Sequence, residues 1–200
     1  MDPDQFRDKA IAIVGNSVRI FDREDGAEID GHEVVIRFNL AWPWRANRPE
    51  CTGVKTTHMR IGARAFRTAE AAADLARVMR ANPDVHFHSG KGDPTKWDLV
   101  SPVDLAPDDV YQGWRDEMQT EHVPTSGAGL LYYLTHHCRP RSITIYGMDG
   151  MRSPIWSKRR SYIHAPCHSP EVERRYLERV MSELPYVSIR PPDALDGGDA

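Results

Sequence analysis

The stretch Ile11–Ser17, IAIVGNS, is a short apolar run that ends in Gly-Asn-Ser. Its apolar part predicts a buried strand. The glycine and the two small hydrogen-bonding side chains would then lie at the carboxyl edge of a sheet, where open α/β folds bind their ligands. Glycine turns also end many strands for purely structural reasons. The heptad therefore predicts a strand and raises, without deciding, the question of a ligand at its end.

Similar short runs recur along the chain and alternate with segments of helical character. The predicted strands are AIAIV, EVVIRF, DVHFHS, SITIYG and YVSIR, and the predicted helices are 66–80, 127–137 and 170–184. This alternation predicts an α/β fold. We expect a single domain over residues 1–190, a long surface loop over Gly90–Pro107 and a disordered tail over 191–200.

The composition is that of an ordinary globular protein of 200 residues with a formal net charge of −3. Such a charge offers no bulk attraction to nucleic acids, and the basic run Lys158–Arg160 is more typical of a solvated face. The polar first residues, MDPDQFRDK, do not resemble a signal peptide or a membrane anchor. Three irregularly spaced cysteines indicate free thiols in a reducing compartment. We therefore expect a cytoplasmic protein without a transmembrane segment.

Two common nucleotide motifs are missing, and a possible metal motif is incomplete. GNSVRIFD contains no Gly-x-Gly-x-x-Gly, and SGKGDPTK does not satisfy the Walker A pattern. HAPCH, from His164 to His168, offers two imidazoles and a thiol but no convincing fourth ligand. Two histidines just before a helix that Ser169 can cap are suited to proton transfer and anion stabilisation. A zinc-binding protein remains an alternative.

Taken as a longer unit, IAIVGNSVRIFDREDGAEIDGHEVVIRFNLAWP resembles the large sialyl motif of the glycosyltransferase family 29 sialyltransferases. The residues that fall in register without a gap are Gly15, Asn16, Ser17, Gly26, Ile29, Asp30, His32, Val34, Ile36, Arg37, Phe38 and Asn39.

Three further segments are similar to family motifs and follow in the family's order, so that the resemblance runs from about residue 9 to residue 180. TGVKTTHMRI resembles the segment after the large motif, and VPTSGAGLLYYLTHHCRPRSITIYGMDG resembles the small sialyl motif. SYIHAPCHSPEVE is similar to the third motif running into the very small motif, whose His-x-x-x-x-Glu pattern is met by His168 and Glu173.

The chain also departs from the family pattern. Val18 replaces the glycine after Gly-Asn-Ser, and Ile11 replaces the large-motif cysteine, which leaves Cys138 without its usual disulfide partner. The spacing from Cys138 to Tyr146 is two residues longer, and the spacing between His164 and His168 is shorter than in animal enzymes. These departures predict a cytoplasmic, bacterial protein, with peripheral association at the inner membrane left open.

The resemblance implies a GT-A-like fold with a central, mostly parallel sheet, and an inverting, metal-independent transfer from a CMP-activated sugar acid to a glycan hydroxyl. CMP-sialic acid is the expected donor, and no further cofactor is implied. The residues implied to bind the nucleotide sugar are Asn16, Ser17, Asn39, Thr125, Ser126, Gly127, Gly147 and Tyr162.

His168 is the expected general base, and His164, with Tyr162 nearby, is expected to stabilise the departing phosphate. Glu173 is expected to orient the His168 loop or the histidine itself. Two alternatives stay open: transfer of another CMP-activated ulosonic acid such as Kdo, and a catalytically silent CMP-sugar-binding module.

Overall fold

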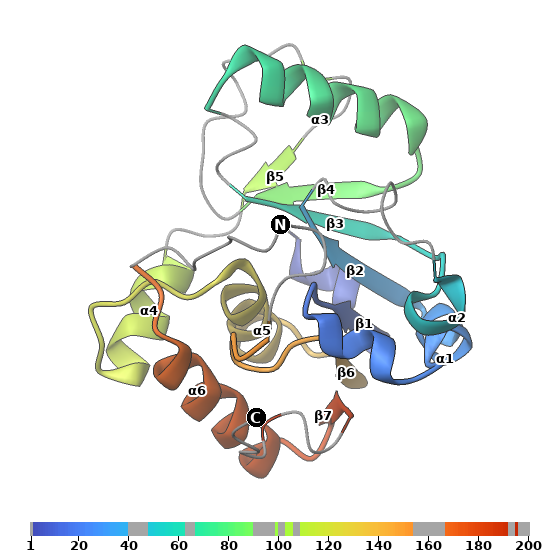
Figure 1. Ribbon diagram of the computed structural model, residues 1–200. Helices are drawn as coiled ribbons and strands as arrows, with labels where there is room; N and C mark the ends of the chain where they lie inside the picture. The colour runs from blue at the N-terminus through green and yellow to red at the C-terminus, as the bar shows by residue number, and fades with distance from the viewer. Residues whose placement is uncertain are drawn as a thin grey trace.

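The chain folds around one parallel sheet. The structure is a computed structural model that describes residues 2–39, 48–62, 67–89, 99, 103–105, 109–153, 167–191 and 195. Its seven strands are ordered β5-β4-β3-β2-β1-β6-β7, and every pairing is parallel (Figure 1). The strands are β1 (Ala10–Val14), β2 (Val34–Phe38), β3 (His58–Ile61), β4 (His86–Ser89), β5 (Val103–Leu105), β6 (Ser142–Tyr146) and β7 (Val187–Arg190).

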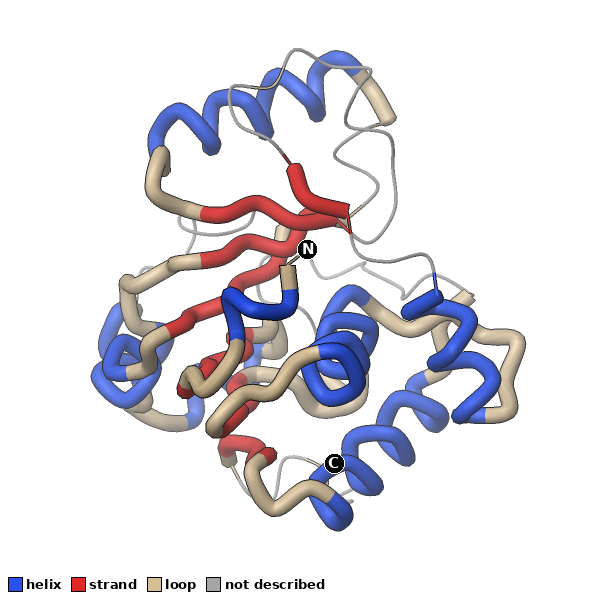
Figure 2. The backbone as a smooth tube through the Cα atoms, turned by 180° about the vertical axis from the view of Figure 1, so that it is seen from behind, coloured by secondary structure: helices blue, strands red, loops and turns tan. Residues whose placement is uncertain are grey.

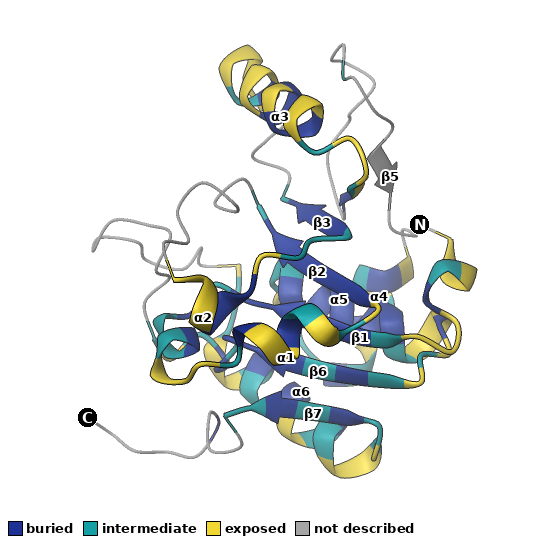
Figure 3. Ribbon diagram, turned by 90° about the vertical axis from the view of Figure 1, so that its right-hand side faces the viewer, coloured by how far each residue is buried: buried dark blue, intermediate teal, exposed yellow. Residues whose placement is uncertain are grey.

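Helices cover both faces of the sheet (Figure 2). They are α1 (Gly26–Gly31), α2 (Pro49–Thr52), α3 (Ala69–Ala81), α4 (Asp109–Met118), α5 (Ser126–His137) and α6 (Pro170–Glu183), with the short 3-10 helices η1 (Pro3–Phe6) and η2 (Val18–Asp22). Helices α4, α5 and α6 lie on one face, whereas α1, α2 and α3 lie on the other. Because both faces are covered, the central strands β1 and β2 are almost entirely buried (Figure 3).

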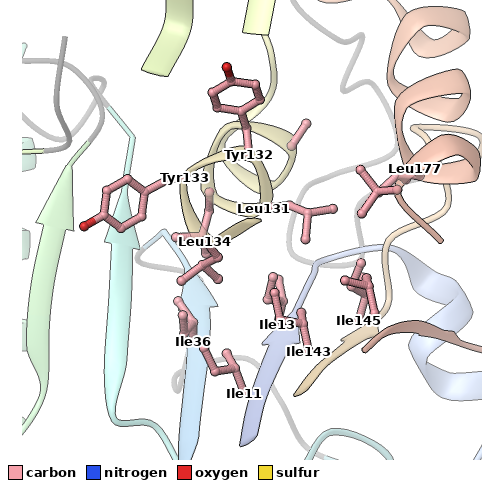
Figure 4. Close-up of a cluster of buried hydrophobic side chains, with 14 of the residues drawn as sticks. Ile11, Ile13, Ile36, Leu131, Tyr132, Tyr133, Leu134, Ile143, Ile145 and Leu177 are labelled. Atoms are coloured by element: carbon pink, nitrogen blue, oxygen red, sulfur yellow. The ribbon is translucent and has the colours of Figure 1, made fainter. Parts of the chain in front are cut away.

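Strand β1 shows how the alternation of side chains divides the core. Ile11 and Ile13 point toward α5 and join the largest apolar cluster, which also includes residues of α4 and α6 (Figure 4). Ala12 and Val14 point to the opposite face and pack with Ile29 of α1. A β-branched run without polar residues is what a strand buried on both faces requires.

Helix α5 is apolar on nearly all sides because it lies between the sheet and its neighbours α4 and α6. Thr125 caps it, and its Oγ1 accepts a hydrogen bond from the Ala128 N–H at 3.4 Å. Tyr133 points toward the sheet, whereas Tyr132 reaches toward α4 (Figure 4), where a Cβ on Gly113 would lie 2.5 Å from the Tyr132 hydroxyl oxygen.

The order of the strands reverses between β1 and β6. From β1 the chain builds outward through β2, β3, β4 and β5, then returns to place β6 against the other side of β1. The two crossover connections that leave this point lie on opposite faces of the sheet, with α1 on one face and α4 and α5 on the other. In open α/β sheets this switch point is where ligands bind.

The α/β fold and the five predicted strands are confirmed, with two corrections. The predicted surface loop over 90–107 contains β5, whose residues pair with β4 in the register Phe87↔Val103. Strand β3 was not predicted as a strand. Both strands are short: β3 (HMRI) and β5 (VDL) alternate polar and apolar residues, but over only four and three residues, so the alternation does not stand out in the sequence.

The predicted helices 127–137 and 170–184 correspond to α5 and α6, and the helix predicted to start at residue 66 starts at Ala69, with Thr68 as its cap. Of the predicted tail over 191–200, only Pro191 and Leu195 are described, and Leu195 packs into the main core.

Candidate functional site

The Gly-Asn-Ser turn lies at the switch point and packs backbone against backbone with the turn after β6. The Gly15 N–H donates to the Tyr146 carbonyl at 2.7 Å, and the Ser17 N–H donates to the Gly147 carbonyl at 3.0 Å. A Cβ on Gly15 would lie 2.2 Å from the Gly147 oxygen, so no side chain fits there. Gly147 has a φ of 60°, a conformation that favours glycine. The two motif glycines therefore allow the two turns to touch.

Asn16 and Asn39 follow neighbouring strands, and the structure brings them together. The Asn16 side-chain Nδ2 donates to the carbonyl of Phe38, the residue before Asn39, at 3.4 Å. Asn39 has a left-handed φ of 61°, and its N–H donates to the Arg60 carbonyl at 2.8 Å. Its Oδ1 accepts a hydrogen bond from the Gly62 N–H at 3.1 Å. Both side-chain amides thus lie at the carboxyl edge of the sheet.

The start of α5 faces the same edge. A Cβ placed on Gly62 would lie 2.9 Å from Asn39 Oδ1 and 4.0 Å from Ser126 Oγ, so Asn39 and Ser126 flank one point. Gly127 packs against Met148, because a Cβ there would lie 2.6 Å from the Met148 Cε. The N–H groups of a helix start and the positive end of its dipole favour an anion such as phosphate.

Glu173 joins the start of α6 to the start of α5. It is 2% exposed, and its two carboxyl oxygens accept hydrogen bonds from the Thr125 N–H at 2.5 Å and from the Thr125 hydroxyl at 2.9 Å. Burial raises the pKa of Glu173 to about 7, although the two Thr125 hydrogen bonds favour the ionised form. Its partner in the structure is Thr125 and not His168, so its contact is with the predicted nucleotide site.

His168 lies two residues before α6, where Ser169 caps the helix and Pro170 begins it. Its Nδ1 lies 2.6 Å from the Val123 carbonyl oxygen. Since a carbonyl oxygen only accepts, Nδ1 carries the proton, and in the neutral ring Nε2 keeps its lone pair. The Cys167 carbonyl accepts a hydrogen bond from the Val123 N–H at 2.8 Å, which ties this segment to the chain before α5. The geometry suits Nε2 to accept a proton.

The Ser17 hydroxyl, predicted to bind the nucleotide sugar, already has two protein partners. Ser17 is 6% exposed; its Oγ donates to Asp149 Oδ2 at 2.9 Å and accepts from the Arg19 N–H at 3.2 Å as the cap of η2. Asp149, which is not among the residues predicted for the site, also accepts a hydrogen bond from the Ser153 N–H at 3.0 Å. The sequence feature that could have identified Asp149 is its position as an acidic residue two places after the glycine that follows β6.

Two predicted site residues, Tyr162 and His164, belong to the segment 154–166, which lies outside the described residues, as does the basic run at 158–160. Among the residues that the structure describes, no group of three or more His, Cys, Asp or Glu is arranged to hold a metal ion. All three cysteines are free thiols, as predicted, with Cys51 and Cys138 buried. No helix in the described part of the chain is long and apolar enough to span a membrane.

Comparisons with known proteins agree with the motif resemblance. Residues 3–97 match the model of glycosyltransferase family 29 (sialyltransferase). No curated protein sequence matches the chain. The resemblance to family 29 inferred from the motifs is thus confirmed for residues 3–97, which carry the Gly-Asn-Ser turn and Asn39.

Solved sialyltransferase structures share the fold. A mammalian sialyltransferase in complex with Gal-beta-1-3GalNAc-ortho-nitrophenol aligns with a TM-score of 0.64 at 17% identity, covering 91% of this chain and 69% of that one. The sialyltransferase CstII from Campylobacter jejuni, in complex with the substrate analogue CMP-3FNeuAc, aligns with a TM-score of 0.61 at 14% identity, covering 92% and 81%. The expected GT-A-like α/β fold is therefore confirmed.

Proposed function

We propose that the chain belongs to glycosyltransferase family 29 and transfers sialic acid from CMP-sialic acid to a hydroxyl group of a glycan. One observation carries the proposal: the Gly-Asn-Ser turn, Asn39 and the start of α5, which lie far apart in the sequence, converge at the switch point of the sheet. These are the segments that resemble the large and small sialyl motifs, and the match to the family model over residues 3–97 supports the first of them.

The CMP moiety of the donor would bind across this edge. Asn16 and Asn39 supply side-chain amides, which can both donate to and accept from a pyrimidine, a ribose or a phosphate. The phosphate would lie before α5, where Ser126 and the first N–H groups of the helix favour an anion. Thr125, held by Glu173, would act through the position of the helix start, since its hydroxyl is already bonded.

His168 would act as the general base. Its Nε2 would take the proton from the acceptor hydroxyl while that oxygen attacks the anomeric carbon and the bond to the CMP phosphate breaks. The hydrogen bond from Nδ1 to the Val123 carbonyl holds the required tautomer and also stabilises the charged ring once the proton has moved. Attack on the face opposite the leaving group would invert the anomeric centre.

The departing CMP carries negative charge that must be stabilised. The resemblance assigns this role to His164 and Tyr162, and the start of α5 would add its N–H groups. Hydrogen-bond donors aimed at the phosphate can do part of the work that a divalent cation does in other glycosyltransferases. We therefore propose a reaction that needs no metal.

A CMP-release assay with purified protein tests the proposal. CMP-sialic acid and CMP-Kdo are offered in parallel, with and without a panel of galactosyl acceptors, in the presence of EDTA, and CMP binding is measured separately by calorimetry. We expect CMP to be released from CMP-sialic acid but not from CMP-Kdo, and only when an acceptor is present. Release from CMP-Kdo alone would replace the proposed donor, binding without release would favour a silent binding module, and no binding would contradict the nucleotide site. Metal analysis of the purified protein before any EDTA is added tests the zinc alternative.

A further inference from the structure

Gly62, which none of the motifs assigns to the site, is the first residue after β3 and lies beside Asn39. Its N–H donates to Asn39 Oδ1 at 3.1 Å. A Cβ at this position would lie 2.9 Å from the same oxygen and 4.0 Å from Ser126 Oγ. Residue 62 is therefore placed between two side chains that come from different segments of the proposed nucleotide site.

The hydrogen bond from Gly62 decides which way the Asn39 amide faces. A backbone N–H only donates, so the side-chain oxygen of Asn39 must face Gly62 and its NH₂ group must face away. The backbone of Asn39 is itself held, because its N–H donates to the Arg60 carbonyl at 2.8 Å and its φ is 61°. With both the backbone and the amide oxygen bonded, the two N–H donors of the side chain have a fixed direction.

The absence of a side chain at residue 62 also leaves room for the Asn39 Oδ1 atom. Cβ contacts shorter than 3.0 Å are essentially never seen, so alanine at residue 62 would push the Asn39 amide away. The atom that must move is the end of a side chain and not backbone. The substitution would therefore disturb the Asn39 amide while the strands keep their positions.

We propose that Gly62 is a positioning residue of the nucleotide site: its N–H and its lack of a side chain hold the Asn39 amide so that Nδ2 donates to an acceptor oxygen of the CMP moiety. This inference rests on the proposed function, because it needs CMP to bind at Asn39. It adds the residue that follows β3 to a site otherwise built by the segments after β1, β2 and β6 and the start of α5.

The test compares Gly62→Ala with Gly31→Ala, a matched control at the end of α1 where an added Cβ meets nothing within 4 Å. CMP affinity is measured by calorimetry, and stability by thermal unfolding without ligand. We expect Gly62→Ala to weaken CMP binding about tenfold, which is what the loss of one well-placed hydrogen bond costs. Gly31→Ala should bind like the wild type, and both variants should unfold at similar temperatures.

A double-mutant cycle asks whether Gly62 acts through Asn39. Asn39→Gly removes the amide and tolerates the left-handed backbone. In that background, Gly62→Ala should have no further effect on CMP affinity. The same tenfold loss in both backgrounds would overturn the inference, as would wild-type affinity of Gly62→Ala or an unfolding temperature far below that of Gly31→Ala. The two failures are distinguishable: if the wild type binds CMP and Gly62→Ala binds it equally well, only the inference fails, whereas if the wild type binds no CMP, the proposed function fails and the inference with it.

Discussion

Two motif residues of the site owe their identity to backbone geometry rather than to side-chain chemistry. Gly15 touches the Gly147 carbonyl so closely that a Cβ would lie 2.2 Å from its oxygen. Gly147 has a φ of 60°, where L side chains are strained. The contact between the two turns therefore explains the glycine of the opening motif. Its neighbour Asn16 is the motif residue that remains a candidate for contacting a ligand.

Gly15→Ala should destabilise the protein by about 3 kcal/mol, because the carbonyl carbon and oxygen of Gly147 would have to shift with the turn after β6. The free energy of unfolding from urea titration measures this. Gly31→Ala, with open space around its added Cβ, is the control and should change the free energy by less than about 0.5 kcal/mol. Equal stability of the two variants would contradict the close approach.

His168→Ala should keep CMP binding and lose transfer. The ring contacts the Val123 carbonyl through Nδ1, so the substitution removes the proposed base without touching Asn16, Asn39 or Ser126. A general base contributes about 10²–10⁴-fold to a rate, and a loss of this size is expected in acceptor-dependent CMP release. His122→Ala, at an exposed histidine, serves as the control. An active His168→Ala enzyme would exclude His168 as the base.

Among the elements, α5 and α6 depend on one another at their starts. Glu173 in the first turn of α6 binds Thr125, the cap of α5, through both carboxyl oxygens. His168 lies just before α6, and Val123, its partner, lies just before α5. The proposed phosphate site and the proposed base are therefore attached to the same pair of helix starts.

Burial of Glu173 predicts a pH-dependent stability. Its pKa is about 7 in the folded state against an ordinary value of 4.5, so the folded protein holds the proton more tightly than the unfolded chain does. Its contribution is fully present below pH 4.5 and is lost as the pH rises through about 7, by roughly 3 kcal/mol in all.

Glu173→Gln, which keeps an oxygen acceptor for Thr125 but does not titrate, should remove this loss. Unfolding in urea at pH 5 and pH 8 measures it, with Glu171→Gln as the exposed control in the same helix turn. If the difference in stability between pH 5 and pH 8 is the same for the wild type and for Glu173→Gln, the buried carboxyl is not its source.

Across the whole molecule, the candidate site and a cluster of buried histidines lie on different parts of the sheet. The carboxyl edge at β1, β2, β3 and β6 holds the candidate site, whereas the α5-side face of β3 and β4 carries a stack of histidines under η1. His58 stacks on His86 and His88, with ring centroids 5.0 and 5.2 Å apart, and Phe6 of η1 lies 5.1 Å from His58. Burial lowers the pKa of His58 to about 4 and that of His88 to about 2.

These buried histidines should make the protein less stable in acid. Their pKa values are lower in the folded state than the ordinary 6.5, so their neutral forms are accommodated fully above pH 6.5, and stability is lost as the pH falls from 6.5 toward 4. This dependence has the opposite sign to that of Glu173. His58→Gln should reduce the loss of unfolding free energy between pH 6.5 and pH 4.5, and His122→Gln should not. An unchanged acid dependence of His58→Gln would refute the role of His58.

Much of the fold and part of the site are predictable from local sequence. Apolar β-branched runs mark β1, β2, β4, β6 and β7, and a cap followed by proline marks the start of α6, because strand and helix signals act over a few residues. The motif that begins with Gly15 also identifies Asn16 and Asn39 as candidates. Strands β3 and β5 escape prediction because their alternation of polar and apolar residues lasts only four and three residues, and their pairing with neighbouring strands becomes visible only in the structure.

The sequence alone determined the α/β class, most of the elements and the family resemblance, since each depends on residues that are near one another in the chain. Only the tertiary structure decided that Ser17 bonds to Asp149, that Glu173 holds Thr125 rather than His168, and that Gly62 orients Asn39. These partners are 132, 48 and 23 residues apart. The order of the strands brings these partners to one edge of the sheet. Contacts between residues so far apart in sequence depend on how the whole chain packs, so no local sequence pattern predicts them.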